Sequence, residues 1–483
     1  MAIRSPLRIV VLGGGPSGLC AAWNLVKDGH RVTLIEREPV CGGQSITFQK
    51  GDWRYDLGPH NIHTQRESIV DFLKRNFGSE LVQIKKRAKI YYRGKRISYP
   101  LTGVDVLKSI NAVTAVHCAL SFLWSRLTSL FIPKFRDNGS YKTWIVNRFG
   151  KKFYDIFFGP YSEKVWKLPA DQLSDVVAKK RIAVLGIVDL IKSIVFKQER
   201  YHPEHPQFVE SYYPQSGIGT VCDFFAKGIR EEGGEIITEA AVEKVVIQNN
   251  SVERIYYSKD GKTNCLDLAQ ESEGAGCMVL STIPVNELLM MSRGDVPQAV
   301  SAAASGLDFT SDIFLYCNIK REDVFGVPLL YFSEPEFFFN RIYDIGIFSR
   351  KMVEPGKTAI CVETTCNYND DLWNMGDDAL FEKCIAALEG HKLLSRSDVE
   401  SYHTRRLVHA YPRFRFGYET NLKTIFSFIN SVENLISFGR QGLFSYANVD
   451  DAIWMGFEVA KYTAYHDRIE LPIKELLPTY IDF

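Results

Sequence analysis

The fold of this chain is decided by residues 8–18, which read RIVVLGGGPSG. The apolar run Arg8–Leu12 predicts a strand, and apolar residues at helical spacing predict a helix over residues 17–27. A second short apolar run, Arg31–Ile35, predicts another strand. The glycines after the first strand fit the pattern G-x-G-x-x-G, which brings a backbone close to a pyrophosphate. The chain therefore opens with a βαβ unit of the kind that binds a dinucleotide.

Each glycine of this turn has its own predicted task. Gly13 allows the tight turn, Gly15 leaves space for the pyrophosphate, and Gly18 lets the helix lie close to the strand. Pro16 directly precedes the predicted helix and Ser17 begins it, and the N-terminal N–H groups and dipole of that helix favour negatively charged phosphates. We expect these five residues to shape or contact the phosphate site.

An acidic residue follows at the end of the second predicted strand. Glu36 stands where its carboxylate can accept hydrogen bonds from the ribose hydroxyls of a dinucleotide, and Arg37 comes next. A strand, a glycine turn, a helix and a terminal acid in this order are much more specific than the glycine pattern alone. We therefore predict that Glu36 and Arg37 belong to a cofactor site.

Two later tracts indicate which dinucleotide is bound. Residues 41–45 read CGGQS, and residues 55–60 read YDLGPH. Both resemble the start of the flavin amine-oxidoreductase superfamily, which includes amine oxidases, protoporphyrinogen oxidases and UDP-galactopyranose mutases. The resemblance implies FAD rather than NAD. The residues that it assigns to FAD are Gly42 and Gly43 at the diphosphate, Gly58 and His60 at the flavin ring, and Val242 at the adenine.

The C-terminal part of the chain carries an independent match. Residues 438–442 read FGRQG, follow a predicted strand and precede a helix that we expect to begin near Asp450. The N-terminus of that helix also favours a flavin or a diphosphate. The residues assigned to FAD here are Gly439, Arg440, Asn448 and Val449. The sequence holds no second G-x-G-x-x-G, so we expect one non-covalent FAD, with NAD(P)H left open as an external reductant.

Five motifs resemble those of UDP-galactopyranose mutases in particular. They lie in residues 58–64 (GPHNIHT), 161–166 (YSEKVW), 341–344 (RIYD), 411–412 (YP) and 439–446 (GRQGLFSY). The resemblance implies that aromatic side chains line a uridine and sugar pocket, and that two arginines clamp a diphosphate by bidentate, charge-assisted bonds. The residues that it places at the substrate are Tyr161, Trp166, Arg181, Arg341, Tyr411 and Tyr446.

Several features depart from that family or leave alternatives open. The chain is longer than the usual bacterial mutase, and Asn448 stands where the family usually has Asp. Residues 93–100 look more like the protoporphyrinogen-oxidase relatives. The register leaves open whether Lys180 or Arg181 faces the pocket. A purely structural Arg341, paired with Asp344 or another acid, is the alternative to a diphosphate clamp.

The expected fold class is α/β, with a Rossmann-like FAD-binding domain of the GR2 type interleaved with two other domains. Residues 1–64, 214–285 and 431–470 are predicted to form the FAD-binding domain. Residues 65–200 are predicted to be mainly helical, interrupted by a strand-turn-strand hairpin at 89–99. Residues 286–430 are predicted to form a mixed-sheet substrate-binding domain.

Three functions remain open on the sequence. The mutase resemblance implies that N5 of the reduced flavin attacks the anomeric carbon as the nucleoside diphosphate leaves, which interconverts pyranose and furanose rings without net redox. The residues with a catalytic role in that reaction would be His60, Arg181, Arg341, Tyr411 and Tyr446. As an amine oxidase or protoporphyrinogen oxidase type of enzyme, the flavin would instead take a hydride, and the tyrosines would form an aromatic cage. The third alternative is a flavin-binding scaffold without turnover.

The composition narrows the classes of partner. A net charge of +1 over 483 residues gives no field that would favour nucleic acid. The ten cysteines form no C-x-x-C pair, and no metal site is predicted. Free thiols and the lack of a signal peptide predict a cytoplasmic protein with a small-molecule substrate. The oligomeric state is left open.

Two apolar segments, residues 112–133 and 183–196, are interrupted by polar or charged residues. Neither offers the roughly 20 unbroken apolar residues that a membrane-spanning helix needs. We expect two buried or half-buried helices, with a peripheral membrane contact as the alternative.

Overall fold

The computed structural model describes residues 6–84, 88–99, 110–131, 138–181, 211–268 and 276–465. At its centre lies the predicted βαβ unit, which consists of β1 (Arg8–Leu12), α1 (Pro16–Lys27) and β2 (Arg31–Ile35). These strands belong to a parallel five-stranded sheet of order β10-β2-β1-β14-β21. The other three strands are β10 (Glu235–Ile237), β14 (Cys277–Ser281) and β21 (Leu435–Ser437).

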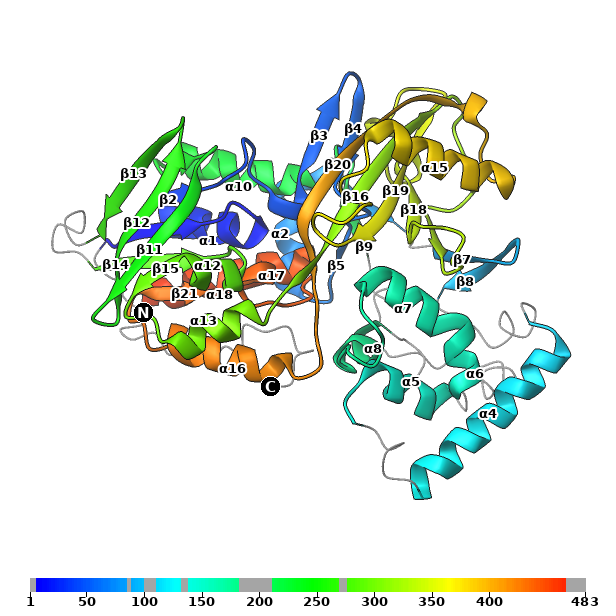
Figure 1. The fold of residues 1–483 in the computed structure, drawn as a ribbon. Helices are drawn as coiled ribbons and strands as arrows, with labels where there is room; N and C mark the ends of the chain where they lie inside the picture. Colours follow the sequence, from blue (N-terminus) through cyan, green and yellow to red (C-terminus); the bar gives the residue numbers. More distant parts are fainter. Residues whose placement is uncertain are drawn as a thin grey trace.

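This sheet is assembled from three separate stretches of the chain, as the interleaved α/β fold predicts. On one side of it, α1 packs against α10 (Gly219–Glu231) and α18 (Val449–Tyr465). The approach is close, because a Cβ on Gly456 of α18 would lie 2.6 Å from the Cβ of Cys20 of α1. The C-terminal helix therefore lies beside the N-terminal one (Figure 1).

A four-stranded sheet of order β13-β12-β11-β15 lies beside the parallel sheet. It consists of β11 (Ala241–Gln248), β12 (Ser251–Lys259), β13 (Lys262–Asp267) and β15 (Ser292–Gly294). Two smaller sheets, β3-β4 and β5-β9-β6, connect the parallel sheet to the rest of the molecule. Their strands are β3 (Thr47–Lys50), β4 (Trp53–Asp56), β5 (Ile62–His63), β6 (Leu81–Ile84) and β9 (Ser211–Pro214).

A mixed sheet of seven strands forms the second large layer, with the order β20-β16-β19-β18-β17-β7-β8. Its strands are β7 (Ala88–Tyr92), β8 (Lys95–Tyr99), β16 (Phe309–Ile319), β17 (Leu329–Phe332), β18 (Arg341–Asp344), β19 (Thr358–Cys366) and β20 (Val399–Pro412). The predicted hairpin at 89–99 is confirmed as β7 and β8. It pairs with β17 at the edge of this sheet, so its strands lie with residues 286–430 although the hairpin falls within 65–200.

The helical part predicted in residues 65–200 forms a lobe below β7 and β8 in Figure 1. Its helices are α4 (Ala112–Phe131), α5 (Tyr141–Phe149), α6 (Lys151–Phe153), the π-helical turn η4 (Tyr154–Phe158), α7 (Gly159–Trp166) and α8 (Val176–Arg181). The apolar segment 183–196 lies outside the described residues. The precise domain boundaries stay a prediction.

The expectation that residues 112–133 form a buried or half-buried helix is wrong for most of the large side chains of α4. Only Cys118 and Ser125 are buried there, while its leucines and Trp124 are exposed.

The remaining helices cover the sheets: α2 (Glu67–Phe77), α12 (Val285–Met291), α13 (Gln298–Ser305), α14 (Ile345–Phe348), α15 (Asp377–Gly390), α16 (Tyr418–Ile429) and α17 (Gly439–Gly442).

A buried polar network joins the N-terminal part of the chain to the seven-stranded sheet. The Asp56 carboxylate accepts a hydrogen bond from the Tyr213 hydroxyl at 2.6 Å. The Asp56 carbonyl oxygen accepts bonds from the hydroxyls of Tyr316 and Tyr343 at 2.7 and 2.8 Å. Satisfied buried networks of this kind hold one arrangement. This network therefore fixes the position of the tract that leads to His60.

Candidate active site

The glycine turn between β1 and α1 has the conformation that its sequence predicts. Gly13 has a φ of +99°, which favours glycine, and a Cβ there would lie 2.5 Å from the Thr282 Oγ1. A Cβ on Gly18 would collide with the carbonyl oxygen of Gly13, so glycine is what lets α1 start close to β1. At Gly15, in contrast, no atom of the described residues outside the immediate turn lies within 4 Å of the place where a Cβ would be. The turn leaves open space at the N-terminus of α1, where a phosphate fits.

A second glycine loop borders the same space. The Gly42 N–H donates to the Gly14 carbonyl oxygen at 2.7 Å, which fixes this loop against the first turn. Gly42 and Gly43 have φ angles of +136° and +55°, and a Cβ on Gly43 would lie 3.3 Å from the Cα of Gly15. Both glycine tracts therefore place backbone atoms without side chains at the same space beside Gly15.

Glu36 is buried directly after β2, beside the glycine turn. One carboxylate oxygen accepts the Gly14 N–H at 2.6 Å, and the other accepts the Glu38 N–H at 2.9 Å. These bonds orient the carboxylate and leave each oxygen a second lone pair. A ribose hydroxyl could donate to those lone pairs, so the predicted role of Glu36 remains a prediction that the geometry permits.

The C-terminal motif reaches the same region. Gly439 begins α17 with a φ of +78°, and a Cβ on it would lie 2.9 Å from the Ser17 Oγ. The Arg440 guanidinium donates to the carbonyl oxygens of Ala447 and Ala410 at 2.6 and 3.1 Å. The last helix, α18, begins at Val449, one residue before the expected position. The two ends of the chain thus form one site.

These segments border a cavity of about 1220 Å³. That volume exceeds the ~300–1,000 Å³ of a pocket for one drug-sized ligand, so there is room for a dinucleotide and a second small molecule. Most residues predicted for cofactor and substrate line it: Gly13, Gly15, Pro16, Ser17, Glu36, Arg37, Gly43, His60, Tyr161, Trp166, Val242, Arg341, Tyr411, Arg440, Tyr446, Asn448 and Val449.

The remaining predicted residues are not in the lining. Gly18, Gly42, Gly58 and Gly439 lie behind it, where they permit close packing of the segments that do line it. Arg181 is the last residue of α8, and its side chain lies outside the described residues, as does that of Lys180. The choice between these two side chains therefore stays open.

Arg341 projects from β18 into the cavity and forms a buried ion pair. Its guanidinium lies 2.6 Å from the Glu363 carboxylate and donates to the Tyr411 hydroxyl at 3.0 Å. The Tyr411 hydroxyl donates to the other Glu363 oxygen at 3.1 Å. Burial lowers the pKa of Arg341 more than any single neighbour raises it. The charge of Glu363, the nearby Tyr411 and Tyr331 and the hydrogen bond to Glu363 together outweigh burial and raise this pKa well above its usual value, so the guanidinium stays charged. Asp344, the partner considered from the sequence, instead accepts a bond from Thr358 at 2.5 Å.

Aromatic rings and a second guanidinium surround this triad. Tyr411 and Tyr446 stack with ring centroids 5.6 Å apart and an interplanar angle of 14°. The Arg440 guanidinium carbon lies 5.5 and 4.8 Å from the same two ring centroids. Trp166 lies against both tyrosines, at 6.1 and 6.5 Å. The site therefore combines positive charge with flat apolar surface, as a phosphate next to a ring requires.

His60 is half-buried at the cavity wall and is neutral. Burial, with added repulsion from Arg440 and Arg341, lowers the pKa of His60 to about 3. Its Nδ1 is buried and has no hydrogen-bond partner in the described part of the chain. A buried polar atom without a partner is costly, so a ligand that bonds to this nitrogen would be favoured.

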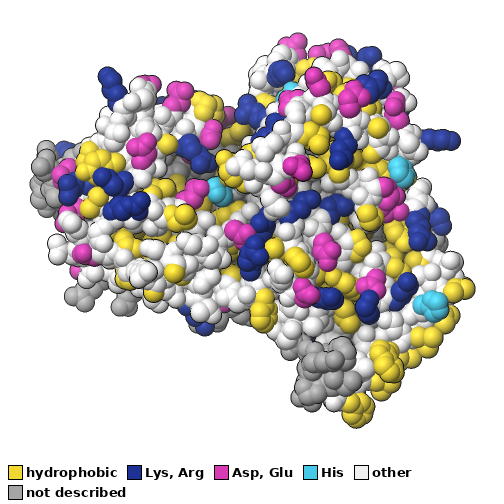
Figure 2. All heavy atoms as spheres, in the orientation of Figure 1, with side chains coloured by type: hydrophobic (Ala, Val, Ile, Leu, Met, Phe, Trp, Pro, Cys, Tyr) yellow, Lys and Arg dark blue, Asp and Glu magenta, His cyan; other side chains and the backbone are white. Residues whose placement is uncertain are grey.

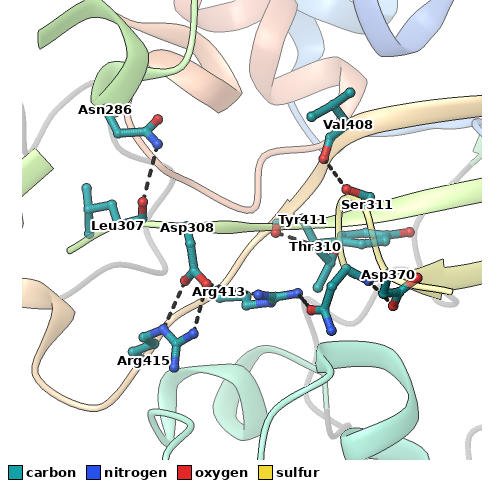
Figure 3. A network of polar contacts seen from close by, with 11 residues as sticks. Asn286, Leu307, Asp308, Thr310, Ser311, Asp370, Val408, Tyr411, Arg413 and Arg415 are labelled. Atoms are coloured by element: carbon teal, nitrogen blue, oxygen red, sulfur yellow. Dashed lines mark hydrogen bonds and ion pairs between the residues drawn. The ribbon is translucent and has the colours of Figure 1, made fainter. Parts of the chain in front are cut away.

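Tyr411 is held in place by a salt-bridge cluster just beyond it (Figure 3). The Asp308 carboxylate accepts a bond from Arg413 at 2.9 Å and two bonds from Arg415 at 2.8 and 3.0 Å. Arg413 also donates to Asn367. Because bidentate pairs fix geometry, this cluster anchors the chain at the end of β20 and so positions Tyr411.

An acidic pair begins α18 next to Asn448, where the mutase family usually has Asp. The Asn448 N–H donates to the Asp451 carboxylate at 3.0 Å, and Arg66 bridges Asp450 and Asp451 at 3.3 and 2.9 Å. Burial, followed by repulsion from Asp451, raises the pKa of Asp450 to about 8. A proton on Asp450 would remove part of the negative charge that opposes an anion at this helix N-terminus.

Sequence reasoning missed several residues of the site. The most important is Glu363. It is the one charged residue in the otherwise uncharged and buried strand Thr358–Cys366, and this isolation could have indicated a buried acid that needs a partner. Gln44 and Gln441 also escaped notice, although both donate to the carbonyl oxygen of His409, at 2.6 and 2.9 Å. Short-range patterns do not identify such residues, because their partners come from distant segments.

The residues present fit a dinucleotide cofactor such as FAD. Open space at Gly15 meets the N-terminus of α1. Elsewhere in the cavity wall, the buried Nδ1 of His60 has no hydrogen-bond partner among the described residues. Among the described residues, no group of three or more His, Cys, Asp or Glu side chains could hold a metal ion. Within the same described ranges, no helix is long and apolar enough to span a membrane.

Known proteins match parts of this chain in sequence. Residues 11–75 match the model of the NAD(P)-binding Rossmann-like domain. An L-amino-acid oxidase of Sistrurus catenatus edwardsii is 40% identical over 80 residues, which are 17% of this chain and 15% of that protein. A Klebsiella pneumoniae protein named "Probable UDP-galactopyranose mutase" is 25% identical over 177 residues, 36% of this chain and 44% of that protein. The matches thus cover less than half of either relative.

Solved structures match over almost the whole chain. A reduced UDP-galactopyranose mutase has a TM-score of 0.81 and 20% identity, and the match covers 95% of both chains. A putrescine oxidase solved with putrescine has a TM-score of 0.61 and 14% identity, and the match covers 95% of this chain and 99% of the oxidase. The predicted fold class is therefore confirmed: the chain has the α/β fold of UDP-galactopyranose mutase.

Proposed function

We propose that this protein is an FAD-dependent enzyme acting on a nucleotide-diphosphate sugar, with a pyranose–furanose ring interconversion like that of UDP-galactopyranose mutase as its reaction. One observation carries the proposal. Arg341, Tyr411, Tyr446 and His60 border the same cavity as the Gly15 turn, which leaves room for a dinucleotide and a second ligand side by side. We also propose a cytoplasmic protein that takes NAD(P)H as an external reductant.

The cofactor end of the site consists of backbone and one acid. The Gly15 turn and the N-terminus of α1 would bind the FAD diphosphate, and Glu36 would bind a ribose hydroxyl. When bound and reduced, the flavin supplies a nucleophile for a sugar carbon. The neutral imidazole of His60 would contact the flavin without adding positive charge.

The substrate end consists of charge and aromatic surface. A guanidinium has five N–H donors, and the contacts of Arg341 with Glu363 and Tyr411 leave others to bind and orient a diphosphate. That interaction would stabilise the negative charge of a departing diphosphate. Tyr446 and Trp166 offer flat faces on which a ring can stack, and close packing there would exclude water.

The proposal is tested by identifying the cofactor and titrating the substrate site. Flavin released by heat should run as FAD in chromatography. UDP and UDP-galactose should shift the flavin spectrum of the reduced protein, whereas nucleosides without phosphate should not. If reduced protein with bound FAD shows no response to any nucleotide diphosphate at millimolar concentration, the nucleotide-sugar function is wrong.

A second candidate function is an FAD-dependent oxidase. Two observations favour it: Glu363 already neutralises Arg341, and Tyr411 and Tyr446 stack into an aromatic wall that could enclose an apolar or amine substrate. An oxidase would release hydrogen peroxide when supplied with amines or amino acids in air. Peroxide formation without any response to UDP would favour this candidate, and a flavin inert to both substrates and reductant would favour a scaffold.

A further inference from the structure

The outermost helix of the helical lobe, α4 (Ala112–Phe131), exposes an apolar stripe. Its members recur at intervals of three and four residues, which places them on one face of the helix. Their exposed fractions range from 54% to 79%. They are Val113, Val116, Leu120, Leu123, Trp124, Leu127, Leu130 and Phe131. Figure 2 shows hydrophobic side chains gathered at the lower right edge, where Figure 1 places α4.

This concentration is unusual for the surface of a soluble monomer. Elsewhere in the described chain, the exposed large apolar side chains are scattered singly, at Val40, Met290, Tyr368 and Phe416. With roughly 150–250 Å² for a whole aromatic side chain, the stripe exposes on the order of 900 Å². The largest apolar patch on a typical monomer is only ~300–600 Å², and larger ones mark interaction surfaces.

The opposite face of α4 is held firmly by the protein. A Cβ on Gly150 would lie 2.6 Å from the backbone nitrogen of Phe122, so α4 packs directly on the end of α5. The Lys152 N–H donates to the Ser121 Oγ at 2.9 Å. Cys118 and Ser125 are buried on this face. The helix is therefore fixed in place, with its stripe facing outward.

The charges around the stripe select the partner. The helix itself has no Asp or Glu, and its one permanently charged side chain is Arg126. Exposed Lys152 and Lys151 lie at the start of α6, which packs against α4, and Asp155 balances Lys151 alone at 2.6 Å. Among the described residues, the charges of α4 and of the start of α6 are thus net positive. A second copy of this chain docked stripe to stripe would bring these cations together, whereas an anionic lipid surface would neutralise them.

We propose that α4 docks this protein onto an anionic lipid bilayer, lying in the plane of the membrane surface. Trp124 and Phe131 would enter the interface region, where aromatic side chains are favoured, and the leucines would contact acyl chains. Arg126 and Lys152 would meet the lipid phosphates. The contact is peripheral, since the fixed inner face of α4 cannot leave the protein.

Vesicle flotation tests this proposal on the full chain. Vesicles of phosphatidylcholine with about 30 mol% phosphatidylglycerol should carry the wild type upward, and pure phosphatidylcholine should carry much less. Leu123→Gln with Leu127→Gln should reduce binding about tenfold or more, because two apolar contacts are lost without a change of charge. The matched control, Met290→Gln with Phe416→Gln, changes exposed apolar residues elsewhere and should bind like wild type. Thermal melts of both variants should match the wild type, because all four side chains are exposed.

The charge contribution has its own variant. Arg126→Gln with Lys152→Gln should lose most of the preference for anionic vesicles and most of the sensitivity to salt. Three results would overturn the proposal: no flotation of the wild type, flotation that the leucine variant retains, or sedimentation as a dimer that the leucine variant dissociates. The last result would assign the stripe to a second copy of the chain.

Discussion

Arg341 and Glu363 face each other directly across the antiparallel strands β18 and β19, with their charged groups 2.6 Å apart. The Glu363 side chain is only 1% exposed and the Arg341 side chain is 19% exposed, so the carboxylate is removed from water and the guanidinium is partly so. A buried charge without a partner is far more costly than an exposed one. The residue proposed to bind a substrate diphosphate is therefore also required to compensate Glu363.

A double-mutant cycle should reveal this dependence. Arg341→Met and Glu363→Met should each lower the free energy of unfolding by about 3–5 kcal/mol, since each leaves one charge buried alone. The free energy of unfolding of the double variant should fall by clearly less than the sum of the two single losses, because neither charge remains. Denaturant unfolding of all four proteins measures the coupling. As a control, Glu382→Gln breaks the exposed pair with Arg396 and should leave stability unchanged. Additive losses at Arg341 and Glu363 would show that the pair is not energetically coupled.

Arg341→Lys should separate binding from folding. The lysine keeps a positive charge for Glu363 but lacks the planar fork that binds a diphosphate at two points. We expect folding and the flavin spectrum to be retained, and UDP binding to the reduced protein to weaken about tenfold, or roughly 1.4 kcal/mol. Spectral titration gives the Kd. Arg350→Lys, which changes an arginine outside the cavity lining, should bind UDP normally. Equal affinity in wild type and Arg341→Lys would remove Arg341 from the substrate site.

Gly15→Val should abolish flavin binding without unfolding the chain. In the described part of the chain, no atom beyond the immediate neighbours of Gly15 lies within 4 Å of a Cβ there, so the side chain would enter the space proposed for the pyrophosphate rather than the protein core. Absorbance at the flavin band and a thermal melt measure the two effects. Gly376→Val is the control, because a Cβ at Gly376 also meets open space but lies outside the cavity lining. A yellow Gly15→Val protein with normal flavin content would contradict the assignment.

His60 should make the protein less stable in mild acid. Its pKa is about 3 in the folded chain against an ordinary 6.5, so between these values the unfolded chain binds one more proton. The stability that His60 contributes is fully present above pH 6.5 and is lost as the pH falls toward 3. The free energy of unfolding, measured at about pH 7.5 and pH 5, should fall more for the wild type than for His60→Gln. His117→Gln, on the exposed side of α4, is the control and should follow the wild type. Identical losses in wild type and His60→Gln would refute the shifted pKa.

The sequence by itself determined the elements whose causes are local. The turn from Gly13 to Gly18 depends on backbone conformations and close contacts that a few neighbouring residues decide, so its pattern predicted both the βαβ unit and the open space at Gly15. The hairpin of β7 and β8 and the start of α18 were predicted for the same reason. Glu36 was singled out because it comes directly after the strand that follows the turn, and its contact with a ribose stays a prediction.

Only the tertiary structure decided which distant groups meet. Glu363 became the partner of Arg341 through the register of β18 against β19. Asp344, only three residues after Arg341 in the chain, is instead bonded to Thr358, and no spacing along the chain shows which of the two acids pairs with the arginine. The apolar residues of α4 predicted a buried helix, because hydrophobicity shows that a face avoids water but not which surface covers it. Strand register and the packing of one layer on another arise from contacts between remote segments, and local patterns in the sequence carry little information about such contacts.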